Sequence, residues 1–301
     1  MRQGSLDRNR FDRYQRMDEM RRTTGPFMTV TLLILAAVLV AYLMLVWGLY
    51  VAQRSLLYHP NGDRPRPGPG LAGSVSIEDV PSHDGLGLFS WWAPPKDEGA
   101  PVLLYFHGNA GSQMDREERM AAFVARGWGV LMPAYRYNAG ADGKPSEDAL
   151  IADGRSALDW LLARGIAPVR VVLFGESLGS GIATALAAER EDLAALVLDA
   201  PYDSVTDVAA RLYWYVPVRL LLKDNFDSVA RIGRVRIPVL IGHGGRDRVI
   251  PERHGRRLFE AANEPKHFAY KPDSGHVELF DYGFLDDIDA FFNQVVFSGR
   301  G

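Results

Sequence analysis

VVLFGESLGSG, residues 171–181, is the stretch of sequence that decides the fold. A β-branched and aromatic run leads into a Gly-x-Ser-x-Gly motif, and an alanine-rich run of high helix propensity follows at 182–190. This order predicts a strand, a tight turn and a helix, with glycines beside Ser177 where a Cβ would clash in a strained turn. Ser177 would then present its hydroxyl above a sheet. The motif alone also fits an ordinary Gly/Ser-rich turn, so the remaining sequence has to decide.

The rest of the globular pattern alternates strand-like and helix-like runs. Two runs of alternating polarity at 75–80 and 86–93 flank a turn with Asp84-Gly85, which predicts an antiparallel hairpin. Residues 102–106 are apolar throughout, as in a strand buried on both faces. We expect further strands at 129–132, 169–174, 195–199, 239–242 and 267–270, and helices at 114–126, 146–164, 251–262 and 283–292. This alternation predicts an α/β fold whose mostly parallel sheet has helices on both faces.

The composition limits the possible functions. The chain has 301 residues, of which 47% are hydrophobic and 24% charged, with a formal net charge of -3. That length fits one α/β domain with an appendage. The charge balance, without a Lys/Arg cluster interleaved with aromatic residues, argues against nucleic-acid binding. The absence of cysteine excludes disulfides and thiolate catalysis, and no metal-ligand spacing such as His-Glu-x-x-His is present, so we expect no metal site.

An uncharged apolar segment runs from Phe27 to Ala52. At 1.5 Å per residue such a helix exceeds the hydrocarbon core of about 30 Å, which predicts one N-terminal transmembrane helix. Trp47 and Tyr50, near its end, suit an interfacial aromatic belt. Arginines are concentrated before the segment, which predicts a cytoplasmic N-terminus and an extracytoplasmic globular domain, facing the periplasm if the chain is bacterial.

A cleaved signal peptide is the alternative interpretation of this segment, since it also has a basic region before an apolar one. The apolar run is about twice as long as the hydrophobic region of an ordinary signal peptide and lacks a small-x-small cleavage site at its end, which favours a retained anchor. The expected organisation is then a polar cytoplasmic tail, a transmembrane helix, a Pro/Gly-rich linker and a globular domain with a short helical cap. These parts span 1–26, 27–52, 53–73 and 74–297, with the cap at about 202–228.

A nucleophilic serine needs a base, an acid that orients the base, and donors for an oxyanion. Asp247 follows the expected strand 239–242, and His276 follows the last expected strand. The acid therefore precedes the histidine in the sequence, and each lies on a loop that follows a strand. Asp247 would orient His276 and stabilise its imidazolium. Asp199, at the end of the preceding strand, is the rival acid, and Asp247 also fits a turn or a helix N-cap.

The oxyanion donors would be main-chain N–H groups. One belongs to Leu178, the residue after the serine, and the other to the glycine-rich loop 107–112, HGNAGS. Asn109 is the expected donor there, Ala110 is the alternative, and a plain Gly/Asn turn is the bland interpretation. His107 and His243, each before a glycine, are expected to make structural hydrogen bonds.

Four motifs together resemble the α/β-hydrolase superfamily: LYFHGNAG at 104–111, GESLG at 175–179, the segment 243–251 with Asp247, and Gly275-His276. More narrowly, the chain is similar to membrane-anchored α/β-hydrolase domain-containing serine hydrolases, whose better-known relatives are lipid, thioester or protein-depalmitoylating esterases. The resemblance covers about residues 75–295 and implies a catalytic triad. One departure is AYRYN at 134–138, where relatives usually show Asp-Tyr-Arg-Gly-Tyr-Gly; this loop borders the site and bears on the substrate.

The expected cap is dense in apolar residues, with Tyr213, Trp214, Tyr215 and the leucines 220–222. They fit an acyl pocket, a surface that dips into the membrane interface, or a cover for the domain's own core.

These features predict a single-pass, membrane-anchored serine hydrolase. It would cleave a lipid-like or acyl ester or thioester through an acyl-enzyme on Ser177, with no cofactor and a small-molecule substrate. The alternatives are a non-catalytic hydrolase-fold membrane scaffold and a peptidase of the same fold. Nothing in the sequence indicates a protein partner.

Overall fold

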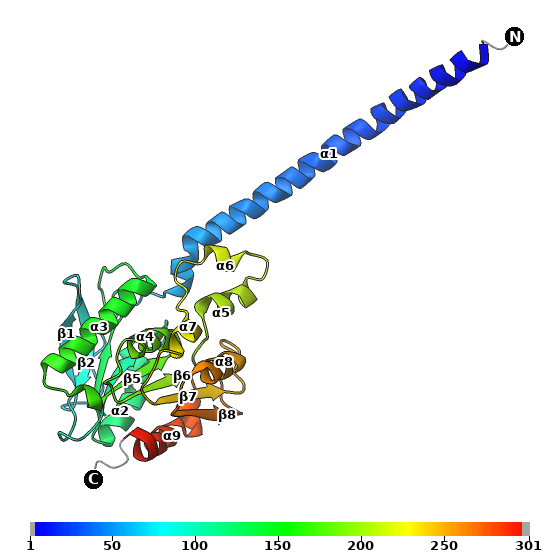
Figure 1. Ribbon diagram of the computed structural model, residues 1–301. Coiled ribbons are helices and arrows are strands. Elements are labelled where there is room, and N and C mark those ends of the chain that lie inside the picture. Colours follow the sequence, from blue (N-terminus) through cyan, green and yellow to red (C-terminus); the bar gives the residue numbers. More distant parts are fainter. Residues whose placement is uncertain (1–3, 297–301) are drawn as a thin grey trace. The chain divides into compact units, whose positions relative to one another are not determined.

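The computed structural model describes residues 4–296 and forms two compact units, Met1–Ala52 and Gln53–Gly301. Helix α1 (Gly4–Leu57) makes up the first unit, and its last residues belong to the second (Figure 1). Among the described residues, Phe27–Leu57 is the one segment long and apolar enough to cross a membrane. The predicted apolar helix is confirmed. It begins before the apolar run because the preceding residues include many of high helix propensity, such as Arg, Met and Gln.

A mixed sheet organises the second unit (Figure 1). In the described part of the chain it has eight strands in the order β1-β2-β4-β3-β5-β6-β7-β8. The strands are β1 (Ser76–Pro81), β2 (Gly87–Ala93), β3 (Val102–Phe106), β4 (Gly129–Pro133), β5 (Val171–Glu176), β6 (Ala195–Asp199), β7 (Val239–Gly244) and β8 (Lys266–Lys271). β2 is antiparallel to β1 and to β4, and every other neighbouring pair is parallel. The predicted α/β fold with an antiparallel N-terminal hairpin is confirmed.

The strand that precedes the serine differs in its bounds from the predicted 169–174. A 3₁₀ turn occupies Pro168–Arg170, so β5 begins at Val171. It also continues two residues further, because Glu176 still pairs with Asp199 of β6. The carboxyl end of β5 therefore reaches directly to the serine.

Helices cover both faces of the sheet. The α-helices described in this unit after α1 are α2 (Glu117–Ala125), α3 (Glu147–Ala163), α4 (Leu178–Ala187), α5 (Val205–Leu212), α6 (Val218–Leu221), α7 (Ser228–Ile232), α8 (Arg253–Ala261) and α9 (Phe284–Phe291). Alternate residues of each buried strand enter different cores: Leu173 joins the cluster under α3, α4 and α8, and Phe174 joins the cluster under α2 and α9. Ser146 caps the N-terminus of α3, since its Oγ accepts a 3.2 Å hydrogen bond from Ala149 N.

Helix bounds differ from the expectations by a few residues. The helix predicted at 114–126 starts as a 3₁₀ turn, Gln113–Arg116, and becomes α-helical at Glu117. α8 begins at Arg253 rather than at Pro251, and α9 ends at Phe291. Helix ends vary in this way because the terminal turn has fewer main-chain hydrogen bonds to hold it.

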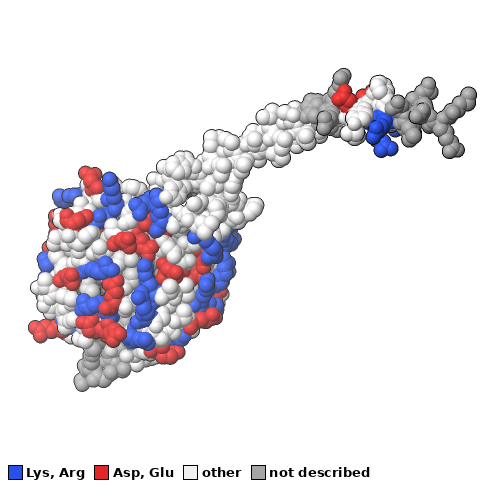
Figure 2. Space-filling model, turned by 45° about the horizontal axis from the view of Figure 1, so that its top comes forward, with Lys and Arg blue, Asp and Glu red and all other residues white. Residues whose placement is uncertain are grey.

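Charges are interspersed over the globular unit. Figure 2 shows acidic and basic side chains side by side on its visible face, as expected for a formal net charge of -3. Part of α1 carries no charge in the same view. The face in view therefore has no extended basic surface of the kind that binds nucleic acid.

Candidate active site

Ser177 lies at a sharp turn between β5 and α4. Its main-chain angles are φ 49° and ψ -115°, a conformation that side-chain-bearing residues rarely adopt. The Ser177 N–H donates a 2.9 Å hydrogen bond to the carbonyl of Asp199 on the neighbouring strand, which holds the turn in place. The side chain is left partly exposed at the carboxyl edge of the sheet. The strand, turn and helix predicted from residues 171–190 are therefore present.

The glycines beside Ser177 make this turn possible. A Cβ on Gly179 would lie 2.1 Å from the carbonyl oxygen of Phe106, at the end of β3. A Cβ on Gly175 would lie 2.6 Å from the Cα of Ser180. Both contacts are with main chain, which has no room to move, so α4 packs this closely against β3 and β5 only with glycine at these positions.

Asp247 lies on the loop that follows β7, with its side chain buried. Its Oδ1 accepts main-chain hydrogen bonds from Val249 at 2.9 Å and Ile250 at 2.8 Å. Oδ2 remains for His276. His243 helps to hold the same loop in place, because its Nε2 lies 2.8 Å from the carbonyl oxygen of Ile250. The loop therefore aims one carboxylate oxygen at the histidine.

His276 lies on the loop that follows β8, and two main-chain hydrogen bonds join this loop to the Asp247 loop. Gly245 N donates to Lys271 O and Arg246 N donates to Ser274 O, both at 2.9 Å. A Cβ on Gly244 would lie 2.4 Å from the main-chain oxygens of Ser274 and Gly275. The two loops are thus in close main-chain contact, which keeps the acid and the histidine in register.

The side chains of Asp247, His276 and Ser177 are joined by two successive hydrogen bonds. His276 Nδ1 lies 2.7 Å from Asp247 Oδ2, and His276 Nε2 lies 2.9 Å from Ser177 Oγ. Burial disfavours the imidazolium, but the hydrogen bond and the charge of Asp247 outweigh burial, so the pKa of His276 is raised above its ordinary value. A histidine held in this way can take a proton from the serine and keep it, which is what a nucleophilic serine requires.

Asp199, the rival acid, points elsewhere. Its Oδ2 accepts a 3.0 Å hydrogen bond from Arg119, and among the described residues it makes no hydrogen bond to His276. Burial raises the pKa of Asp199 to about 6 despite this arginine. The structure brings Asp247, and not Asp199, to the histidine.

The loop expected to supply an oxyanion donor lies against the serine. A Cβ on Gly108 would be 3.6 Å from the Cβ of Ser177. The Asn109 side chain faces the other way, and its Nδ2 donates a 3.0 Å hydrogen bond to the carbonyl of Leu57. Leu178 is the first residue of α4, where main-chain N–H groups have no acceptor within the helix. Leu178 and the loop that contains Asn109 therefore both lie beside Ser177.

The loop at 134–138, where the chain departs from its relatives, is fixed by buried contacts. The Tyr135 hydroxyl donates a hydrogen bond to the carbonyl of His107, in the loop beside the serine. Arg136 Nη2 pairs with Asp153 at 2.7 Å, and Arg136 Nη1 reaches Asp84 of the N-terminal hairpin at 3.0 Å. This loop thereby supports the wall of the site.

A buried ionic cluster beneath Ser177 was not expected from the sequence. Glu176 accepts hydrogen bonds from Arg116 at 2.6 Å, from Arg119 at 2.9 Å and from the Tyr105 hydroxyl at 2.6 Å. Burial alone would raise the pKa of Glu176, but the two guanidinium groups outweigh it and lower the pKa to about 2. One sequence feature indicates that Glu176 needs a compensating charge, its position at the end of a buried strand, but the sequence does not indicate which residues supply that charge.

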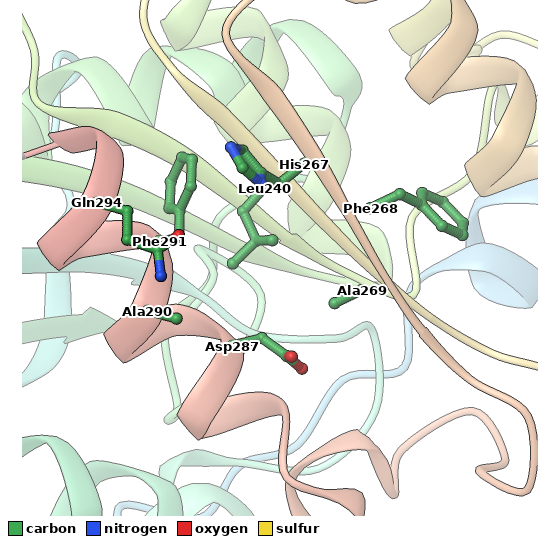
Figure 3. Close-up of a pocket in the computed structure, with 8 residues that line it drawn as sticks. All are labelled: Leu240, His267, Phe268, Ala269, Asp287, Ala290, Phe291 and Gln294. Atoms are coloured by element: carbon green, nitrogen blue, oxygen red, sulfur yellow. The ribbon is translucent and has the colours of Figure 1, made fainter.

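A cavity of about 140 Å³ lies elsewhere, between β8 and α9 (Figure 3). It is lined by Leu240, His267, Phe268, Ala269, Asp287, Ala290, Phe291 and Gln294. None of the triad residues lines it, so it is not part of the candidate active site. Among residues 4–296, no group of three or more His, Asp or Glu side chains is placed to hold a metal ion.

Comparisons with known proteins show the family of the chain. The family described as "alpha/beta hydrolase fold" matches residues 101–226. The uncharacterized protein Rv2307c of Mycobacterium tuberculosis is 37% identical over 273 residues, which cover 89% of this chain and 95% of the relative. The uncharacterized protein YfhR of Escherichia coli O157:H7 is 31% identical over 235 residues, which cover 75% of this chain and 81% of the relative.

Solved structures of esterases have the same fold. The esterase Pf2001 of Pyrococcus furiosus superimposes with a TM-score of 0.65 at 18% identity, over 78% of this chain and 98% of that one. The propionate-bound esterase Est2 of Thermogutta terrifontis superimposes with a TM-score of 0.62 at 20% identity, over 78% and 99%. At these identities the likeness concerns the fold.

Proposed function

The chain belongs to the α/β-hydrolase superfamily, and from this we propose that it is a serine hydrolase that cleaves a carboxylic ester or thioester through an acyl-enzyme on Ser177. One observation carries the proposal: a hydrogen-bonded line of Asp247, His276 and Ser177 that ends at a serine in a strained turn, with distances of 2.7 and 2.9 Å. Strain at such a turn persists only where surrounding contacts impose it, and it is common at functional sites.

The proposed reaction has two halves. Ser177 Oγ attacks the substrate carbonyl carbon while its proton moves to His276 Nε2, and the carbonyl oxygen becomes an oxyanion. As the oxyanion collapses, the bond to the leaving alcohol or thiol breaks and His276 returns the proton to that group. Water then attacks the acyl-enzyme with His276 as base, releasing the carboxylic acid and restoring Ser177. Asp247 keeps the imidazole oriented and stabilises its charged form.

The oxyanion would be held by the N–H groups of Leu178 and Asn109. Support comes from the position of Leu178 at the start of α4, where the helix dipole also favours negative charge. The loop with Gly108 lies against the serine from the other side, as such a donor requires. Removing one donor of this kind typically costs about 10²–10³-fold in kcat.

We also propose that residues 27–52 anchor the chain in a membrane, with residues 1–26 in the cytoplasm and the hydrolase domain, 74–297, outside it. The support is the length and composition of the segment together with the arginines before it. The Pro/Gly-rich residues 53–73 would connect the anchor to the domain, and residues 202–228 would form its cap. Small acyl esters or lipid-like esters are the expected substrates.

Hydrolysis of p-nitrophenyl esters of increasing acyl length by the detergent-solubilised full chain tests the proposal. Ser177→Ala should lower kcat by about 10³-fold or more, whereas the exposed Ser74→Ala should leave it unchanged. A fluorophosphonate should label the wild type and the Ser74 variant but not the Ser177 variant. If neither hydrolysis nor labelling occurs in the wild type, the chain is a non-catalytic scaffold; cleavage of an amide reporter alone would indicate a peptidase.

A further inference from the structure

Four large apolar side chains between α5 and the end of α6 point into solvent. Leu212, Trp214, Tyr215 and Leu220 are 67%, 81%, 42% and 85% exposed, and we call them the apolar patch. Trp214 and Tyr215 contact each other edge to face, with ring centroids 5.7 Å apart. Exposed aromatic and leucine side chains grouped in this way usually mark a surface that binds something.

The same segment has an inner face that explains how it attaches to the protein. Val205 and Val218 are buried, and Val208 and Leu222 pack against the core cluster that α4 also joins. Covering the core therefore accounts for the inner face and leaves the apolar patch unexplained. The patch faces away from that core, so its residues contribute little to folding.

The charged residues within the segment that carries the apolar patch are of one sign. Residues 211–223, RLYWYVPVRLLLK, include three basic residues and no acidic one. Arg211, Arg219 and Lys223 are exposed, and Arg219 pairs with Asp207 of α5 at 2.6 Å. Basic groups beside aromatic and leucine side chains match the boundary of a phospholipid bilayer, where phosphates lie next to the acyl chains.

The segment is tied to the residues that directly follow the uncharged run. Gln53 Oε1 accepts a 2.8 Å hydrogen bond from Lys223 N, and Gln53 Nε2 donates to Leu221 O at 3.4 Å. Arg54 makes two hydrogen bonds to the Asp224 carboxylate, at 2.8 and 3.0 Å. Because Gln53 is the next residue after Ala52, a chain anchored through 27–52 holds these contacts at the level of the lipid headgroups.

We propose that the apolar patch, with Arg211, Arg219 and Lys223, binds the surface of the phospholipid bilayer in which the chain is anchored. Trp214 and Leu220 enter the boundary between headgroups and acyl chains, and the basic groups contact lipid phosphates. This inference rests on the proposed membrane anchoring. It adds a second contact with the membrane, which keeps the hydrolase domain beside substrates dissolved in the bilayer.

Single-cysteine labelling tests the proposal directly, because the chain has no cysteine of its own. The full chain is placed in nanodiscs of phosphatidylcholine and phosphatidylglycerol and labelled with the fluorophore NBD at Leu220→Cys. Leu39→Cys, in the apolar run, is the positive control, and Ile77→Cys, exposed on edge strand β1, is the negative control. Doxyl-labelled lipid should reduce fluorescence at positions 39 and 220 but not at 77, and aqueous iodide should do the reverse.

The controls separate the two membrane contacts. If lipid quenches position 39 while iodide quenches 220 as strongly as 77, the anchor is inserted and the patch proposal is overturned. Shielding of position 220 from both quenchers also overturns it, since a protein, such as a second copy of this chain, then covers the patch. Loss of lipid quenching at position 39 would instead refute the anchor on which the proposal rests.

Activity gives a second measurement. The double variant Trp214→Ser, Leu220→Ser should hydrolyse a long-chain methylumbelliferyl ester in the nanodisc several-fold more slowly than the wild type. Its rate with water-soluble methylumbelliferyl acetate should be unchanged, because both side chains are exposed and neither belongs to the triad. An equal loss with both esters would contradict a role in membrane binding.

Discussion

Arg119 Nη2 donates a 2.6 Å hydrogen bond to the carbonyl of Val277, the residue after His276. The same guanidinium contacts Glu176, the residue before Ser177, at 2.9 Å. One arginine on α2 therefore joins the strand end that carries the proposed nucleophile to the loop that carries the proposed base. The distance between Oγ and Nε2 depends on both ends of this link.

We expect Arg119→Met to lower kcat by about 10–100-fold with little change in KM, because small misplacements of catalytic groups cost rate rather than binding. Ester hydrolysis under steady-state conditions measures both constants. Arg126→Met is the matched control, since Arg126 follows the same helix and makes a half-exposed pair with Asp289. Equal kinetics of the two variants would contradict a positioning role for Arg119.

The pH dependence of hydrolysis should report His276. The base must be neutral, and its pKa is raised, so kcat/KM should fall as the pH drops through a value above about 6.5. In the Asp247→Asn variant this fall in kcat/KM should occur at lower pH, and the constant value of kcat/KM at higher pH should be about 10³–10⁴-fold lower than in the wild type.

Asp199 titrates in a neighbouring range, with a pKa raised to about 6 by burial, so it needs a control. Asp199→Asn should keep the fall in kcat/KM at low pH and move it slightly to lower pH. This carboxylate makes no hydrogen bond to His276 in the described structure, but its charge helps to raise the pKa of His276. If the fall in kcat/KM at low pH disappears in this variant, the titration belongs to Asp199 instead.

Glu176 should contribute to stability. Glu176→Gln leaves the buried Arg116 and the partly buried Arg119 with less compensating charge, which we expect to cost about 3–5 kcal/mol in the free energy of unfolding at neutral pH. Urea denaturation measures it. Glu189→Gln, which breaks a half-exposed pair with Arg155, should cost less than about 1 kcal/mol.

Protonation of the Glu176 carboxylate should contribute to the denaturation of the protein by acid. Its folded pKa, about 2, lies below the ordinary value of 4.5. Its contribution is therefore complete above pH 4.5 and is lost as the pH falls towards 2. The stability difference between wild type and Glu176→Gln should shrink across this window, and a constant difference would show that the charge of Glu176 is not its source.

Gly179→Ala should destabilise the fold by about 1–3 kcal/mol or more, because the new Cβ would overlap the carbonyl of Phe106. Thermal denaturation followed by circular dichroism measures the change. Gly62→Ala is the matched control: no heavy atom lies within 4 Å of the position that a Cβ on Gly62 would take, and we expect a change within about 0.5 kcal/mol.

The sequence was sufficient for the parts of this molecule that depend on local pattern. The strand before Ser177 and the helix after it follow from propensity and from the glycines of the motif. The order of Asp247 and His276, each after a strand, placed them on adjacent loops because parallel strands end at the same edge of the sheet. The contacts among these three side chains agree with that expectation, while their role in a reaction remains a prediction.

The ionic cluster could not be predicted in the same way. Arg119 and Glu176 lie far apart in the sequence, and only the order of the strands brings α2 beneath the end of β5. The outward direction of Trp214 and Leu220 was equally inaccessible, because apolar density in a short segment does not reveal which side chains face the core. Both features depend on tertiary packing rather than on periodicity.

The hydrogen bond from Asn109 to the carbonyl of Leu57 has a mechanical consequence. Leu57 is the last residue of α1, and Asn109 belongs to the loop beside Ser177. Tension applied to the chain at its membrane end would load the contacts of Gln53 and Arg54 with residues 221–224, and through this bond it would reach the loop beside Ser177. In an anchored enzyme, lateral stress in the lipid could in this way alter turnover while leaving the fold intact.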